Sequence, residues 1–148
     1  KLDEGRYDAI ILAAAGLRRL GWGKRITAVL PLGQLLPAVG QGALAIVGRA
    51  RQKARWRALN DPTTEIATKA ERALLEALGG GCHVPIGAYA RLRQDTLLLD
   101  AIVADPKGKS FVRDRLRGDP TRPEKAGRQL ARCLLEQGAG EILSDQTS

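Results

Sequence analysis

Three successive glycines, Gly79 to Gly81, separate a helical pattern from a strand-rich pattern in this 148-residue chain. Before them, Asp61 can cap a helix whose first residue is Pro62, an arrangement that these residue types favour. Apolar residues then recur at helical spacing as far as Leu78, so we predict that the helix ends at Gly79. Because glycine readily adopts a positive φ and leaves room beside the backbone, a bulky group can approach the loop that follows.

Three strands are predicted beyond the glycines, over residues 86–93, 97–104 and 110–117. Gln94-Asp95 and residues 105–108 supply turn-forming side chains between them. Connections this short bring neighbouring strands together in antiparallel order. We therefore expect an antiparallel meander.

A second helix is predicted after the strands. Thr121 and Glu124 stand at capping-box spacing with Pro123 between them, and Gly138 supplies a stop. Cys133 falls on the apolar face of this helix, and we interpret it as a core residue rather than a reactive one. These features predict a small α+β domain of a three-stranded sheet with two helices.

The first half of the chain carries two short apolar runs that predict buried strands of an α/β domain. Residues 7–13 form the first run, which leads through Gly16 into a helix-like segment with Arg19. In open parallel sheets, ligands bind beyond the carboxyl ends of the strands, so Arg19 is well placed for an anion. The second run follows Gln41, whose glycine neighbours permit close backbone approach; a tight turn is the alternative interpretation.

The formal net charge of +8 implies an anionic partner but does not identify it. Nucleic acid, a membrane surface and a polycarboxylate small molecule all qualify. The basic residues of the run 49–57 alternate every two positions, which spreads them around a helix, so we interpret this run as a solvated surface. No apolar run approaches the roughly 20 residues that span a bilayer, and no signal-peptide pattern is visible.

The two cysteines of the chain, Cys82 and Cys133, are too few for a disulfide framework. A reducing cytoplasmic setting with free thiols is therefore expected. Cys82 directly follows the glycines, and from spacing alone its sulfur is either accessible to a ligand or buried as a structural thiol. Metal binding is disfavoured, because Cys82 and the adjacent His83 supply at most two ligands where structural zinc usually takes four.

Several short motifs, taken in order along the chain, resemble those of porphobilinogen deaminases, also called hydroxymethylbilane synthases. They are Tyr7-Asp8-Ala9-Ile10-Ile11-Leu12-Ala13, Ala15-Gly16-Leu17, Arg19-Leu20-Gly21, Ala38-Val39-Gly40-Gln41-Gly42-Ala43, Ala70-Glu71-Arg72-Ala73, Gly80-Gly81-Cys82-His83-Val84-Pro85-Ile86-Gly87 and Gly138-Ala139-Gly140-Glu141-Ile142-Leu143. Each motif alone is weak, but the set is highly specific and runs over the whole chain. The resemblance covers the later half of such an enzyme, and we expect a portion of a longer polypeptide, since the chain starts at Lys1 and contains no methionine.

The resemblance implies a three-domain enzyme whose first two domains are α/β modules of the periplasmic-binding-protein type, with a cleft between them. Residues 1–36 would be the final part of the second domain, and residues 37–58 would cross back into the first. Residues 59–148 would form the C-terminal α+β domain. The full-length protein would be a cytoplasmic monomer, and the N-terminal half of the same enzyme would be the partner of this chain.

The implied activity belongs to porphyrin and heme biosynthesis. Four porphobilinogen molecules condense head to tail, with loss of ammonia, onto a covalently held dipyrromethane, and hydrolysis then releases hydroxymethylbilane. Cys82 matches the cysteine that holds this cofactor through a thioether, and Arg19 matches an arginine that binds carboxylates. Gln41, Ala13 and Gly16 match residues that line the cleft. The catalytic aspartate of the family lies in the N-terminal half, so the resemblance implies no catalytic residue in this chain and an inactive fragment.

A basic nucleic-acid-binding module is the alternative from a different class of protein. The net charge and the basic run around Trp56 support it, because Lys and Arg drive binding to phosphates. Against it, aromatic residues make up only 3% of the chain and no recognised nucleic-acid motif is present. Arginine also pairs with carboxylates in bidentate geometry, which accounts for a basic cleft without nucleic acid.

Overall fold

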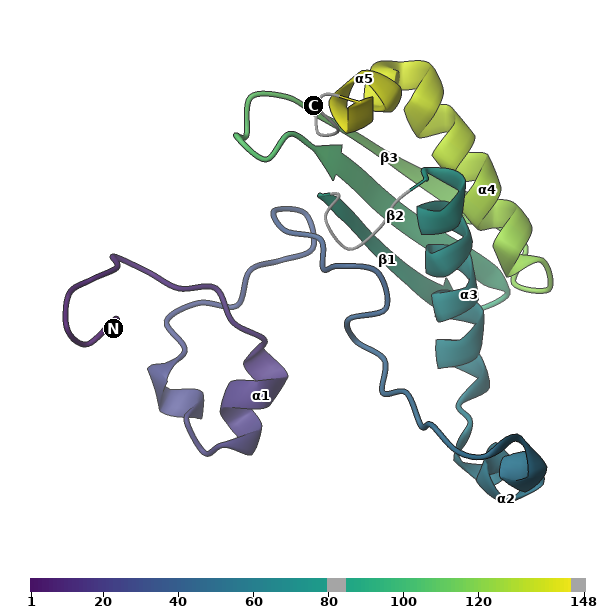
Figure 1. Cartoon of the computed structure of the whole chain (residues 1–148), viewed down its shortest axis with the longest axis horizontal. Helices are drawn as coiled ribbons and strands as arrows, with labels where there is room; N and C mark the ends of the chain where they lie inside the picture. The colour runs from purple at the N-terminus through teal and green to yellow at the C-terminus, as the bar shows by residue number, and fades with distance from the viewer. Residues whose placement is uncertain (80–84, 145–148) are drawn as a thin grey trace. The chain divides into compact units, whose positions relative to one another are not determined.

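The computed structural model of the chain describes residues 1–79 and 85–144, and these divide into two units, Lys1–Leu35 and the part that begins at Leu36. The first unit contains α1 (Ala14–Arg19) and the 3-10 helix η1 (Gly23–Arg25). The second contains, in order, η2 (Ala50–Gln52), α2 (Lys53–Trp56), η3 (Arg57–Leu59), α3 (Pro62–Ala77), β1 (Ile86–Arg93), β2 (Thr96–Ala104), β3 (Phe111–Gly118), α4 (Pro123–Leu134), the π-helical segment η4 (Leu135–Ala139) and α5 (Gly140–Ser144) (Figure 1).

Helix α3 begins and ends where the sequence predicts. The backbone N–H of Thr64 donates to the Asp61 carboxylate at 2.7 Å, so Asp61 is the N-terminal cap and Pro62 is the first helical residue. The last helical residue is Ala77, and Gly79 follows with a φ of 68°. A positive φ of this kind is what a glycine just beyond a helix provides.

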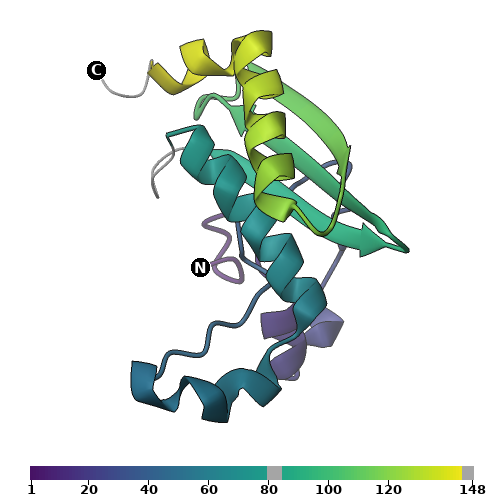
Figure 2. The ribbon, with the colours of Figure 1, turned by 90° about the vertical axis from the view of Figure 1, so that its right-hand side faces the viewer.

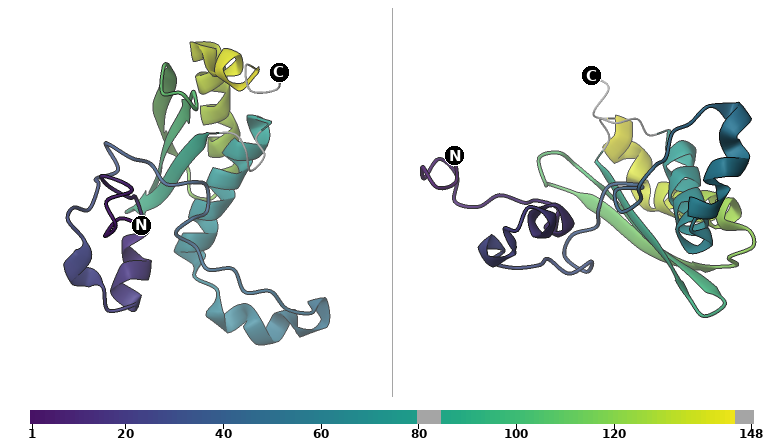
Figure 3. Two further views of the ribbon diagram at one scale, coloured as in Figure 1. Left: turned by 60° about the vertical axis from the view of Figure 1, so that its left-hand side comes forward. Right: turned by 90° about the horizontal axis from the view of Figure 1, so that it is seen from below.

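The three strands form the predicted antiparallel meander, in the order β1-β2-β3. Helices α3 and α4 lie side by side over one face of this sheet (Figure 2), and the view from below shows the sheet and the helices as two layers (Figure 3). The side chains that fill the space between the layers are mainly aliphatic, and the largest of those fully buried are Leu74, Leu97, Leu99, Val103, Leu130 and Leu134. The expected small α+β domain is therefore confirmed.

The predicted capping box at the start of α4 is wrong. Arg122 occupies the cap position without a side-chain cap bond, and Pro123 is the first helical residue. The Thr121 hydroxyl instead donates to the Asp119 carboxylate at 2.7 Å, which holds the turn before the helix. At the other end, Gly138 does break the helix, with a φ of 97°, but α5 follows directly. Cys133 is a free thiol that is half-buried rather than fully in the core.

The strands predicted in the first half of the chain are not formed. Residues 7–13 and 43–47 have no strand conformation, and Ile11, Leu44 and Val47 are 70%, 94% and 95% exposed. A fully buried strand requires neighbouring strands and a layer over each face. Nothing in residues 1–79 or 85–144 supplies these neighbours, so the apolar runs stay exposed.

Gly127 marks a close approach of α4 to α3, and its replacement tests the packing of the two helices. A Cβ at this position would lie 2.2 Å from the carbonyl oxygen of Ala70 and 2.8 Å from the backbone nitrogen of Leu74. We predict that Gly127→Ala lowers the free energy of unfolding by about 1–3 kcal/mol, because the helices must move apart. Urea unfolding followed by circular dichroism measures this loss.

Gly140→Ala is the matched control for this prediction. A Cβ at Gly140 would have its nearest neighbour, Cδ2 of Leu135, at 3.8 Å, which is ordinary contact. This variant should change the free energy of unfolding by no more than about 0.5 kcal/mol. Equal destabilisation by the two substitutions would contradict the proposed role of Gly127 in helix packing.

Candidate functional site

Three of the predicted site residues lie around helix α1. Ala13 is its N-terminal cap, Gly16 lies in its first turn and Arg19 is its last residue. All three are exposed, and a Cβ added at Gly16 would meet no atom within 4 Å. Gly16 and Arg19 stand three residues apart on one helix, so the arginine follows an accessible stretch of backbone.

Arg25 and Arg19, in the same unit, differ in whether their side chains contact other residues of the chain. Arg25 forms an ion pair with Asp3 and lies 5.6 Å from the centroid of the Trp22 ring. For Arg19, no hydrogen-bonding or ionic partner is found among the residues that the structure describes. Arg19 can therefore bind an anion without first breaking a contact within the chain.

Gln41 lies in the second unit, in a tight turn. Its side-chain Oε1 accepts the backbone N–H of Ala38 at 3.1 Å, and its own backbone N–H donates to the Ala38 carbonyl at 3.1 Å. Gly40 adopts a φ of 70°, a conformation that side chains disfavour. The structure thus shows the tight turn that was the alternative interpretation of this motif, and a role for Gln41 in lining a cleft stays a prediction.

Glu71, on the buried side of α3, joins this turn to the sheet. The backbone N–H of Gly40 donates to Glu71 Oε2 at 2.7 Å, and the backbone N–H of Ala90 in β1 donates to Oε1 at 2.8 Å. Only 6% of the Glu71 surface is exposed. A single carboxylate therefore connects the Gln41 turn, helix α3 and strand β1.

The motifs of the sequence did not identify Glu71 as a functional residue, although a signal was present. Glu71 stands four residues after Ala67 and three before Leu74, and so falls on the apolar stripe of the helix. An acidic residue on a buried stripe requires hydrogen-bonding partners. The sequence does not say where those partners lie, because Gly40 is 31 residues away.

Burial raises the pKa of the Glu71 carboxyl group above its ordinary value. The backbone N–H groups of Ala90 and Gly40, and the charge of Arg72, act in the opposite direction but do not fully offset the burial. Each of the two oxygens nevertheless accepts an N–H, an arrangement that suits the ionised form, in which both oxygens are acceptors.

Cys82, the predicted covalent site, lies outside the described residues, as does His83. The structure does describe the elements on either side of it. Helix α3 ends at Ala77 and strand β1 begins at Ile86, so these two elements flank the segment that carries Cys82. Helix α3 carries Glu71, whose carboxylate accepts backbone N–H groups from β1 and from the Gln41 turn.

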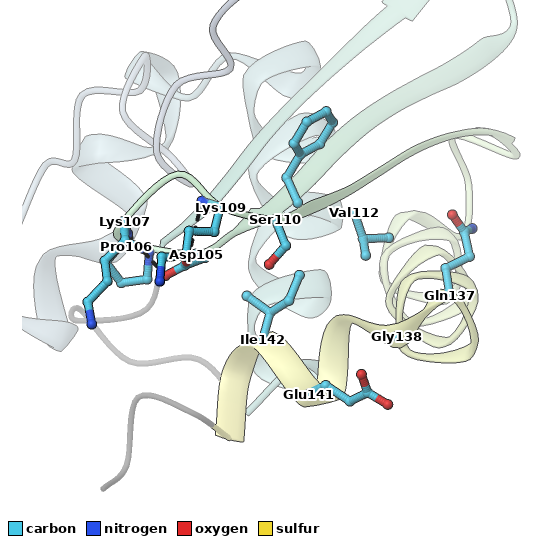
Figure 4. A pocket seen from close by; sticks show the side chains of 11 residues that line it. Asp105, Pro106, Lys107, Lys109, Ser110, Val112, Gln137, Gly138, Glu141 and Ile142 are labelled. Atoms are coloured by element: carbon cyan, nitrogen blue, oxygen red, sulfur yellow. Dashed lines mark hydrogen bonds between the residues drawn. The ribbon is translucent and has the colours of Figure 1, made fainter.

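An open groove lies between the β2–β3 loop and the segment from Gln137 to Ile142, where Ile142 points toward the loop (Figure 4). Lys107 and Lys109 lie on one side of it, but Asp105 and Glu141 balance their charge. The Asp105 carboxylate also accepts the backbone N–H groups of both lysines, at 3.0 and 3.2 Å. None of the predicted site residues lines this groove, so it is not the candidate site.

The face of the sheet opposite the helices carries a network of charged side chains. Asp100 of β2, only 3% exposed, binds Arg91 of β1 at 2.6 Å and Arg115 of β3 at 2.5 Å. Burial acts to raise the pKa of Asp100, but the hydrogen bonds and charges of the two guanidinium groups outweigh it and hold the pKa below its ordinary value. Two of the arginines that contribute to the net positive charge are thus engaged in ion pairs within the fold.

Two further features of the described residues concern membrane-spanning helices and clusters of metal-binding side chains. In the described part of the chain, no helix is both long and apolar enough to cross a membrane. The same residues contain no group of three or more His, Cys, Asp and Glu side chains arranged to hold a metal ion.

Comparison with known protein families gives two matches that together cover most of the chain. Residues 1–56 match the family description "Porphobilinogen deaminase, dipyromethane cofactor binding domain". Residues 66–136 match "Porphobilinogen deaminase, C-terminal domain", and Cys82 lies within this second match.

Curated relatives give the same result. The chain is 49% identical over 146 residues to a porphobilinogen deaminase of Thiobacillus denitrificans, with 97% of this chain and 48% of the relative covered. It is 49% identical over 147 residues to that of Desulforudis audaxviator and 48% identical over 147 residues to that of Nitrosomonas europaea, with the same coverage. The chain therefore spans about half the length of the curated relatives that it matches.

The Asp100 network gives a testable dependence of stability on pH. Because the pKa of Asp100 is lower in the folded than in the unfolded chain, its stabilising contribution is present above about pH 4 and is lost as the pH falls through the folded-state pKa. We predict that Asp100→Asn lowers the free energy of unfolding at pH 7 by about 1–3 kcal/mol, a range kept low because Arg115 is mostly exposed and screened by solvent. Urea unfolding at a series of pH values from 7 down to about 2 measures the effect.

Asp95→Asn, in the exposed turn between β1 and β2, is the control for the Asp100 substitution. It should leave stability nearly unchanged at every pH. A cost of Asp100→Asn that stays constant from pH 7 down to about pH 2 would show that the ionised network is not what stabilises the sheet.

Proposed function

Because this chain belongs to the porphobilinogen deaminase family, we propose that it is the cofactor-holding half of a hydroxymethylbilane synthase. The full-length enzyme condenses four porphobilinogen molecules head to tail, with loss of ammonia, and releases hydroxymethylbilane by hydrolysis. The observation that carries this proposal is the match of both halves of the chain, residues 1–56 and 66–136, to domains of one enzyme family. What the residues of this chain contribute is a tether and a surface for carboxylates.

Cys82 is the proposed tether. Its sulfur would hold dipyrromethane through a thioether, and the bound cofactor supplies the terminal pyrrole to which the first substrate is joined. The residue directly follows glycines, which favour the approach of a bulky ligand to the sulfur. A carbon–sulfur bond also keeps each intermediate attached between additions, which hydrogen bonds and ion pairs alone would not.

Arg19 is the proposed carboxylate-binding residue, and Ala13, Gly16 and Gln41 are the proposed lining of the cleft. Each pyrrole ring of the growing chain carries two carboxylates, so negative charge accumulates as the chain lengthens. Arginine neutralises a carboxylate through two parallel hydrogen bonds. The exposure of Arg19 and the open space next to Gly16 support this assignment, because a planar ring can approach the backbone there.

The distribution of exposed apolar side chains supports a complementary N-terminal half. Among the described residues, every exposed large hydrophobic side chain except Phe111 and Leu135 precedes Asn60. Large apolar side chains that are left exposed in such numbers indicate surfaces that another part of the protein covers. We propose that residues 1–36 and 37–58 complete two α/β domains of the periplasmic-binding-protein type, and that residues 59–148 form the third domain.

The complete enzyme is, in this proposal, a cytoplasmic monomer. Its catalytic aspartate belongs to the N-terminal half, as in the family that the sequence resembles, so the 148-residue chain alone has no activity. Neither a metal site nor nucleic-acid binding is part of the proposal.

Intact-mass spectrometry of the full-length protein tests the tether. We expect an added mass equal to one dipyrromethane, located on the peptide that contains Cys82 and lost in Cys82→Ser. Cys133→Ser is the control and should keep the added mass, because Cys133 lies half-buried on α4. An active enzyme with an unmodified Cys82 would rule out the assignment.

Replacement of Arg19 tests the carboxylate surface. We predict that Arg19→Ala in the full-length enzyme lowers kcat/KM for porphobilinogen at least tenfold, roughly the loss of one charge-assisted hydrogen-bond pair. The fold should be retained, because the side chain is exposed. Arg128→Ala, at an exposed position of α4, is the matched control. Normal turnover of Arg19→Ala, measured at several substrate concentrations, would remove Arg19 from the site.

A further inference from the structure

We propose that Glu71 is a positioning residue, whose carboxylate holds the Gln41 turn in register with the two elements that flank Cys82. This inference rests on the proposed function, because it concerns the cleft residue Gln41 and the tether Cys82. Glu71 itself contacts backbone groups and no predicted ligand-binding side chain. It would therefore act on the reaction only through the segments that it connects.

Glu71 joins three separate stretches of chain, its own helix and two others that donate to its carboxylate. It belongs to α3, which precedes Cys82, and it accepts the N–H of Ala90 in β1, which follows Cys82. It also accepts the N–H of Gly40, the residue before Gln41. The Gln41 turn and both flanks of the Cys82 segment are thus tied to a single side chain.

Glu71 and the segment before Gln41 share one edge of the sheet. β1 is an edge strand, and the backbone N–H of Ala88 donates outward to the Pro37 carbonyl at 2.9 Å. Two residues further along, the N–H of Ala90 donates to Glu71 instead. The segment before Gln41 and the Glu71 carboxylate therefore take up successive donors of one strand edge, which fixes the turn against the strand.

The two contacts of Glu71 require a carboxylate. Glu71 uses a different oxygen for each of the two N–H donors, at 2.7 and 2.8 Å. Glutamine has the same shape but only one acceptor oxygen, so its NH2 group would face one of the donors. Glu71→Gln therefore breaks one of the two anchoring bonds while it preserves the volume of the side chain.

Movement of the Gln41 turn is expected to slow the reaction, because catalysis depends on the exact placement of contributing groups. The Gln41 side chain is held in its own turn by the Ala38 N–H, so release of the Gly40 bond frees the turn to move as a unit about the Pro37–Ala88 contact. Displacement of a contributing group by about 1 Å can lower a reaction rate by around a hundredfold. Release of the turn would shift Gln41 relative to the flanks of Cys82.

Hydrogen exchange in the full-length protein tests the two hydrogen bonds of Glu71 without a measurement of activity. In Glu71→Gln, we expect exchange at the Gly40 or Ala90 amide to become at least about tenfold faster, with unchanged exchange at Leu99 in the centre of the sheet. Glu76→Gln is the matched control, because Glu76 is exposed on the same helix. Unchanged exchange at both Gly40 and Ala90 would overturn the proposal.

Kinetics distinguish positioning from a purely structural role. We expect Glu71→Gln to lower kcat about tenfold with little change in KM, at a temperature where circular dichroism shows the variant to be folded. In a double-mutant cycle with Gln41→Ala, the two losses should be strongly non-additive, because both act through one turn. Additive losses, or normal kcat in Glu71→Gln, would overturn the positioning role.

A second variant keeps the test decisive if Glu71→Gln is poorly folded. Glu71→Asp retains an ionised carboxylate but is one methylene shorter, so it cannot reach both donors and should give the same pattern of exchange and kinetics. If the unsubstituted full-length protein did not convert porphobilinogen, the proposed function would fail, while the exchange at Gly40 and Ala90 would still decide whether the anchor exists.

Discussion

A carboxylate that is removed from water has to be paired, and in this chain the pairing of Glu71 determines how the elements around the candidate site are joined. Its two oxygens accept backbone N–H groups from Gly40 and Ala90, which lie far apart in sequence. Both hydrogen bonds reduce the energetic cost of burying the charge, and the loss of either donor would raise that cost. The carboxylate therefore fixes helix α3, strand β1 and the Gln41 turn relative to one another.

The two parts of the chain differ in how much of their apolar surface is buried. From α3 onward, the sheet and the helices enclose a core of fully buried aliphatic side chains. Before Asn60, Leu36 is the one large apolar side chain in the buried core of the described structure, and many others are exposed. This contrast agrees with a C-terminal domain that has its own core and with preceding segments whose surfaces belong to larger domains.

The parts of the fold that could be predicted from the sequence are those set by local signals. Asp61 and Pro62 fix the start of α3, Gly79 fixes its end, and short turns dictate the meander. The capping box at Thr121 failed because Asp119 competes for the same hydroxyl. The strand predicted at residues 7–13 failed because a local apolar pattern indicates the need for neighbours but cannot supply them.

The candidate site was predictable only in part, for a related reason. The local chemistry of Arg19, and of Gly16 beside it, can be read directly from the residues. The role of Glu71 depends on Gly40, at a separation of 31 residues, and no periodicity within α3 encodes that distance. Cys82 lies outside the described residues, so its assignment continues to depend on its motif.

The meander also has a consequence for how the C-terminal domain assembles. Each strand pairs with the next one along the chain, so only short loops have to be closed before the sheet exists. Docking of the Gly40 segment onto β1 instead closes a much longer stretch of chain and carries a larger entropic cost. The sheet and its helices can therefore form first, and the Gly40 segment is then captured on an edge that already exists.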